Sequence, residues 1–112
     1  MAIVVQSKLT SEMYTPEQER SAKDPTRFKL RPLSGVQYLD VISYFVEGTN
    51  GQKLSAKGME QVLSYGVVKA ENLFNDKGKQ TQALEYLDPI TTAELVSRIM
   101  ELSEIRESER KN

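Results

Sequence analysis

The stretch that decides the fold is Phe28-Lys-Leu-Arg-Pro-Leu-Ser-Gly-Val-Gln-Tyr-Leu-Asp-Val-Ile-Ser-Tyr-Phe-Val-Glu47. Pro32 disfavours the α region for the residue before it, so residues 28–31 are predicted to be extended. Ser34 is a good N-cap residue, and Gln37 three positions later completes a capping-box pattern. The sequence therefore predicts a short extended run followed by a helix that starts at Ser34.

The predicted helix, over residues 34–47, is the most apolar segment of the chain. Apolar or aromatic side chains occupy eight of the eleven positions from 36 to 46. A helix that is apolar on most of its circumference is normally buried on several sides. We therefore expect this helix to be central, either as the core helix or as part of an interface.

Two more helices are predicted downstream, over residues 55–74 and 91–106. Ser55 can cap the second helix, whereas either Asp88-Pro89 or Thr91-x-x-Glu94 can start the third. Apolar residues recur at helical spacing in both segments. They are Met59, Val62, Leu63, Val67, Ala70, Leu73 and Phe74 in the second helix, and Leu95, Val96, Ile99, Leu102 and Ile105 in the third.

The predicted fold class is therefore mainly α, with three principal helices and a short extended or β segment near the N-terminus. Residues 1–26 are interpreted as a loosely attached, partly mobile arm, and residues 27–112 as the helical domain. Within the arm, residues 2–5 favour a strand because of their β-branched side chains.

The composition excludes several classes of function. The chain has 112 residues, no cysteine and no histidine. Disulfides, thiolate zinc sites, the commonest general base and the commonest transition-metal ligand are thus all missing. We therefore expect no enzymatic activity, no metal and no cofactor.

A formal net charge of −1 gives no electrostatic case for binding nucleic acid, and no apolar run approaches the roughly 20 residues of a membrane span.

Two polar patterns resemble binding sites. Glu71 and Asp76 do not have the spacing of a calcium loop, so a solvated turn is favoured over a metal site. Arg27, Lys29 and Arg31 alternate along the extended run and would share one strand face. A solvated strand edge is favoured there over a strip that binds anions.

The amount of apolar surface on short helices exceeds what the two other helices can easily cover. One interpretation is a compact three-helix monomer, and the other is self-association or a hydrophobic partner helix. Self-association is slightly favoured.

Four segments give the chain a resemblance to a known family. They are Phe28-Lys-Leu-Arg-Pro-Leu-Ser-Gly35, Gly66-Val-Val-Lys-Ala-Glu-Asn-Leu-Phe-Asn-Asp-Lys-Gly78, Tyr86-Leu-Asp-Pro-Ile90 and Leu95-Val-Ser-Arg-Ile-Met-Glu-Leu-Ser-Glu-Ile105. In this order they resemble the tail assembly chaperones of long-tailed bacteriophages of the lambdoid type. The likeness covers residues 27 to 106.

The resemblance implies a mostly helical, non-catalytic protein that acts in the host cell cytoplasm. Such chaperones coat the tape-measure protein, keep it soluble and help to recruit tail-tube subunits, and they tend to self-associate. The chain would then cover apolar client helices in the helix-in-groove mode. We expect the groove between the central helix and the last helix, near Tyr44, Phe45, Ile99 and Leu102. An apolar N-terminal tip, Ile3, Val4 and Val5, is a second candidate for linking subunits.

Three alternatives remain open. The first is a DNA-binding helical domain, which would need a basic recognition helix; the last helix instead carries three glutamates against Arg98 before residue 106. The second is a virion structural or head–tail connector subunit. The third is a small self-associating helical regulatory domain.

Overall fold

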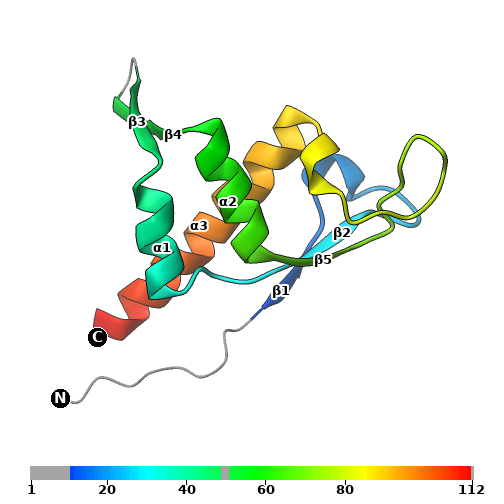
Figure 1. The fold of residues 1–112 in the computed structure, drawn as a ribbon. Coiled ribbons are helices and arrows are strands. Elements are labelled where there is room, and N and C mark those ends of the chain that lie inside the picture. The colour runs from blue at the N-terminus through cyan, green and yellow to red at the C-terminus, as the bar shows by residue number, and fades with distance from the viewer. Residues whose placement is uncertain (1–10, 49–50, 112) are drawn as a thin grey trace.

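The computed structural model describes residues 11–48 and 51–111. These residues form five strands, three α-helices and two short 3-10 helices (Figure 1). In chain order they are β1 (Glu12–Tyr14), η1 (Glu17–Glu19), β2 (Arg27–Leu30), α1 (Gly35–Ile42), β3 (Phe45–Gly48), β4 (Gly51–Leu54), α2 (Ala56–Gly66), β5 (Val67–Glu71), η2 (Leu84–Tyr86) and α3 (Pro89–Lys111).

The strands make two antiparallel sheets, so the prediction of a mainly α fold was wrong and the protein is a mixed α/β domain. One sheet has the order β1-β2-β5, and the other is the β3–β4 hairpin. Strands β1 and β5 lie far apart in the sequence and join one sheet only because each pairs with β2, on opposite sides of it. Pairing between distant segments leaves little trace in local periodicity, which is why helix was predicted instead.

The second helix ends at Gly66 rather than at residue 74. Residues 67–71 continue directly as β5, whose β-branched Val67 and Val68 suit a strand. Arg31 stabilises the helix end, because its backbone N–H donates to the Gly66 carbonyl at 2.9 Å and its Nε donates to the Tyr65 carbonyl at 2.9 Å. Two carbonyls that a helix end leaves without partners are thus satisfied by the chain that follows β2.

The first helix is also shorter than predicted. Its capping box is confirmed, since the Ser34 side chain accepts from the Gln37 N–H and the Gln37 side chain accepts from the Ser34 N–H. The helix ends at Ile42, however, and Phe45–Gly48 pairs with Gly51–Leu54. The two strands form a hairpin in which Gly48 pairs with Gly51, and β3 contains the aromatic Phe45 and the β-branched Val46 that had been assigned to the helix.

The third helix begins two residues earlier and ends five residues later than predicted. Asp88 is its N-cap: the Asp88 carboxylate accepts from the Thr91 N–H at 3.0 Å. Pro89 then occupies the first helical position, where a missing N–H costs nothing. Of the two starts left open by the sequence, the structure has Asp88-Pro89.

Strand β2 is the centre of the larger sheet. Phe28 and Leu30 are fully buried on its inner face, and the predicted alternation with Arg27 and Lys29 on the other face is confirmed. Strand β1, from the N-terminal segment, pairs with it through Glu12↔Leu30 to Tyr14↔Phe28. The basic residues of β2 therefore lie on the outer face of a central strand and not along an edge.

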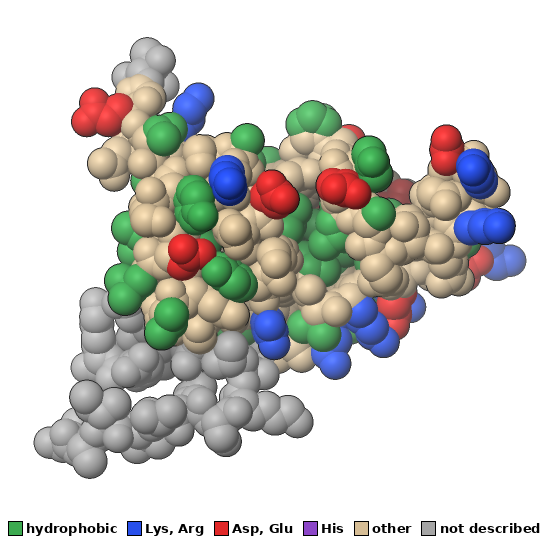
Figure 2. All heavy atoms as spheres, viewed as in Figure 1, with side chains coloured by type: hydrophobic (Ala, Val, Ile, Leu, Met, Phe, Trp, Pro, Cys, Tyr) green, Lys and Arg blue, Asp and Glu red, His purple; other side chains and the backbone are tan. Residues whose placement is uncertain are grey.

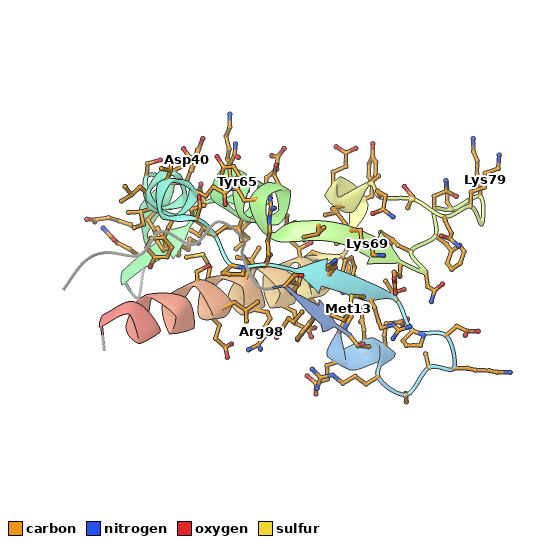
Figure 3. All side chains as sticks on the ribbon, turned by 90° about the horizontal axis from the view of Figure 1, so that it is seen from below. Met13, Asp40, Tyr65, Lys69, Lys79 and Arg98 are labelled. Atoms are coloured by element: carbon orange, nitrogen blue, oxygen red, sulfur yellow. The ribbon has the colours of Figure 1, made fainter. Side chains whose placement is uncertain are left out.

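The core forms where the inner face of the sheet meets α2 and α3. Figures 1 and 3 place α1 and α2 in one layer and α3 in another, while the β3–β4 hairpin stands away from both. Helix α2 packs against both other helices. The buried apolar residues are Phe28, Leu30, Leu33, Val41, Val62, Leu63, Ala70, Leu95, Val96 and Ile99.

Helix α2 approaches α3 closely at Gly66. A Cβ atom built there would lie 2.6 Å from Cδ1 and from Cγ2 of Ile99, far inside normal contact. Because Ile99 is fully buried, its side chain has little room to move aside.

Gly66→Ala is therefore expected to lower the free energy of unfolding by about 1–3 kcal/mol through overpacking. Gly35→Ala is the matched control, since a Cβ there has nothing within 4 Å. The control should change stability by less than about 1 kcal/mol. Urea denaturation of both variants measures the difference, and equal midpoints would show that the close approach at Gly66 is not a constraint.

Candidate protein-binding surfaces

The described residues contain no obvious chemical centre. No group of three or more acidic side chains is placed to hold a metal ion in the part of the chain that the structure describes. The buried polar side chains there, Thr91 and Ser103, both have partners. Thr91 Oγ1 accepts from Gln18 at 2.7 Å, and Ser103 Oγ accepts from the Leu33 N–H and donates to the Ile99 carbonyl, each at 2.8 Å. Both hydroxyl groups therefore make hydrogen bonds between segments of the fold.

The main polar cluster attaches the N-terminal segment to α3. Arg98 forms two hydrogen bonds with the Glu12 carboxylate, at 2.6 and 3.0 Å. The Glu94 carboxylate accepts from the Tyr14 hydroxyl and from the Glu17 N–H. Burial raises the pKa of Tyr14, and its hydrogen bond to Glu94 adds to the shift. The hydrogen bond to Glu12 likewise raises the pKa of Arg98. Every charged group in this cluster has a structural partner.

The outward face of α1 is a stripe of exposed apolar side chains. The exposed fractions are 80% for Val36, 69% for Leu39 and 43% for Ile42, and Val46 on β3 adds a fourth side chain at 45%. Figure 2 shows hydrophobic side chains gathered over α1 and the base of the hairpin. We call these four residues the α1 face.

No charged side chain belongs to the α1 face. Asp40 is the only charged residue of helix α1, and it lies toward α2, where its carboxylate accepts from the Tyr65 hydroxyl at 2.6 Å (Figure 3). This hydrogen bond raises the pKa of Tyr65. The carboxylate is thus engaged at the border of the face, and the face itself remains uncharged.

A groove lies between α2 and the segment that contains η2. It encloses about 470 Å³, with Met59 and Leu63 from α2 and Leu84 from η2 as its apolar lining. Glu60 and Glu85 are exposed on the two walls. In the centre of Figure 2 the groove appears as a green hollow bordered by acidic side chains.

Gln82 fixes the wall of this groove that η2 provides. Its side-chain oxygen accepts from the Ala70 N–H and its side-chain nitrogen donates to the Ala70 carbonyl, both at 2.8 Å. The amide thus takes the place of a neighbouring strand at the outer edge of β5. No element was predicted from the sequence between residues 75 and 90, and the groove was therefore missed.

The outer face of the sheet is basic but partly neutralised. Lys29 lies directly opposite Lys69 in the register, an unfavourable pairing of like charges. Glu71 offsets it, with its carboxylate 3.3 Å from Lys69 and 3.9 Å from Arg27. This mixed surface favours the interpretation of Arg27 and Lys29 as solvated residues, whereas Arg31 lies beyond the strand and its Nε donates to the Tyr65 carbonyl.

The structure does not gather the predicted site residues into one groove. Tyr44 lies against Gly58 of α2, whereas Ile99 contacts Gly66, eight residues and about 12 Å further along that helix. Ile99 is fully buried and therefore unavailable to a partner. Phe45 and Leu102 are half-buried, and Ile3, Val4 and Val5 lie outside the described residues.

The chain matches no protein-family model, and no significant match to it was found among curated proteins or solved structures. Among the described helices, none is both long enough and apolar enough to cross a membrane.

The start of α3 borders the groove through Thr92. Because the N-cap of α3 is the carboxylate of Asp88, its contribution to stability depends on pH. The hydrogen bond from the Thr91 N–H lowers the pKa of Asp88 below its ordinary value of 3.8. A carboxyl whose pKa is lowered by folding stabilises the fold above that ordinary value, and the stabilisation is lost as the pH falls through the folded pKa.

Asp88→Ala is therefore expected to cost about 1 kcal/mol at pH 7, the usual value of an N-cap. The difference from the wild type should shrink as the pH falls below 3.8. Asp76→Ala, in an exposed turn, controls for the loss of a carboxylate. Urea denaturation across pH measures both variants, and a loss for Asp88→Ala that does not vary with pH would contradict the charged cap.

Proposed function

We propose that this chain is a non-catalytic assembly chaperone that self-associates through the α1 face and keeps the apolar helices of a client protein soluble. The observation that carries the proposal is the exposed, uncharged α1 face. Exposed apolar patches rimmed by polar residues mark interaction surfaces in soluble proteins. Depletion of charge at the centre of such a patch is the compositional sign of an interface core.

A second copy of the chain is the occupant that the α1 face fits best. In a two-fold interface the same patch meets itself, so any charge on it would face a like charge. Because Asp40 is held at the border by Tyr65, two α1 faces can meet without that repulsion. Val46 on β3 continues the patch beyond the helix and enlarges the area available to the partner.

The client is proposed from the sequence pattern. The four segments between residues 27 and 106 resemble bacteriophage tail assembly chaperones, whose client is the tape-measure protein and whose later partner is the tail-tube protein. The mostly helical fold implied by that resemblance is corrected by the two sheets, so the choice of client depends on the sequence segments alone.

A long helical client with apolar faces is prone to aggregate in the host cytoplasm before the tube encloses it. A self-associating protein with exposed apolar surface is suited to cover it through many weak contacts.

Leu39→Lys is expected to weaken self-association, because it places a charge at the centre of the α1 face in both copies. The apparent dissociation constant of the oligomer should rise at least about tenfold, an effect shown by the minority of interface residues that dominate binding. Size-exclusion chromatography with light scattering, over a range of concentrations, measures the change. Ile90→Lys is the matched control, an equally drastic change at a helix position that is 75% exposed but outside the face. A monomeric wild type, or equal effects of the two variants, would rule out the α1 face as the contact.

Co-expression with a bacteriophage tape-measure protein, the client that the resemblance implies, tests the client. The expected result is that the tape measure becomes soluble and co-purifies with the chain. If it stays insoluble and unbound, the chaperone proposal fails. Presence of the chain in purified virions would then favour a structural subunit of the particle.

A further inference from the structure

The groove between α2 and η2 differs in chemistry from the α1 face. Its apolar lining, from Met59, Leu63 and Leu84, lies between two carboxylates, Glu60 on one wall and Glu85 on the other. No lysine or arginine lines it. Within the described ranges, neither carboxylate takes part in an ion pair. The groove thus combines an apolar interior with two negative charges that have no cationic partner.

We propose that this groove binds a short amphipathic segment of the client in which apolar residues are flanked by lysine or arginine. The apolar side chains would enter between α2 and η2, and the flanking cations would meet Glu60 and Glu85. Hydrogen bonds between cationic donors and carboxylates are among the stronger polar contacts in proteins. The inference deepens the proposed function, on which it rests, by giving the client-binding site its chemistry.

The size of the groove limits what enters it. A volume of about 470 Å³ lies within the range of pockets that bind drug-sized ligands. It therefore accepts a few side chains from one face of a segment and not a whole helix. Ser64 and Thr92 at its margin offer hydroxyl groups to the backbone or to polar side chains of that segment.

Two features make the groove ready to bind. One wall is a regular helix, and the other is fixed by the two hydrogen bonds between Gln82 and Ala70. A site that is already formed loses less conformational entropy on binding. The α1 face of a second copy is a poorer occupant, because it brings no cation to pair with Glu60 and Glu85. Charge complementarity therefore separates the client site from the self-association surface.

The test uses two synthetic helical peptides of about 18 residues, long enough to form an amphipathic helix. One is built from leucine and lysine, and the other carries glutamate at each lysine position. Fluorescence anisotropy of labelled peptide is measured against the full wild-type chain. The lysine peptide should bind at least about tenfold more tightly than the glutamate peptide, and its affinity should fall as salt is added.

The decisive variant is the double charge reversal Glu60→Lys/Glu85→Lys, which should weaken binding of the lysine peptide by at least about tenfold. Glu47→Lys/Glu104→Lys is the matched control, with the same change of net charge at exposed positions away from the groove. This control should bind as the wild type does. If the charge reversal unfolds the chain, Glu60→Gln/Glu85→Gln replaces it and should weaken binding in the same direction.

Equal binding of the two peptides, or equal loss in the groove variant and the control variant, would overturn the inference. Failure of the groove proposal can be distinguished from failure of the proposed chaperone function. If the groove variant still keeps the tape measure soluble, the groove proposal fails while the chaperone survives. If the lysine peptide binds in the groove but the tape measure stays insoluble, the groove stands and the chaperone proposal fails.

Discussion

The close contact between Gly66 and Ile99 is the constraint on which the rest of the structure depends. It brings the end of α2 against α3, at the point where the chain changes from helix to strand without a loop. Strand β5 must therefore start beside the buried helix pair, which places it next to β2. Arg31 stabilises the same end of α2, because it donates hydrogen bonds to the Tyr65 and Gly66 carbonyls. Phe28 and Leu30 then close the core between the sheet and the helices.

The two proposed surfaces follow from this arrangement, because α2 stands between them. One side of α2 supports α1, whose inward residues reach the core while Val36 and Leu39 remain outside. Another side lines the groove with Met59 and Leu63, and η2 closes that groove because Gln82 binds the free edge of β5. The uncharged face on α1 and the acidic groove on α2 and η2 are thus two separate surfaces, and we propose that the chain uses the first to bind itself and the second to bind a client.

The parts of the fold that local sequence determines were predictable. The Ser34 capping box and the Ser55 cap depend on residues three positions apart, and both are present. Strand β5 was not predictable in this way, because Val67 and Ala70 fit a helical stripe as well as a strand. Only pairing with β2, nearly 40 residues earlier, decides between them. The apolar pattern of the predicted helices indicated more apolar surface than the other helices could cover. Which side of α1 stays exposed depends on tertiary packing, which that pattern does not determine. The groove depends on a loop folding back, which no local pattern encodes.

Amide hydrogen exchange, measured by mass spectrometry on the chain alone and in the presence of the client that we propose, a tape-measure protein, tests the separate roles of the two surfaces most directly. Exchange reports local opening, so a bound partner slows it where it covers or stabilises the backbone. We expect the client to slow exchange in residues 56–64 and 82–88, beyond any protection that self-association gives to residues 35–42. Slowing confined to residues 11–30, with the groove segments unchanged, would contradict the assignment of the client to the groove.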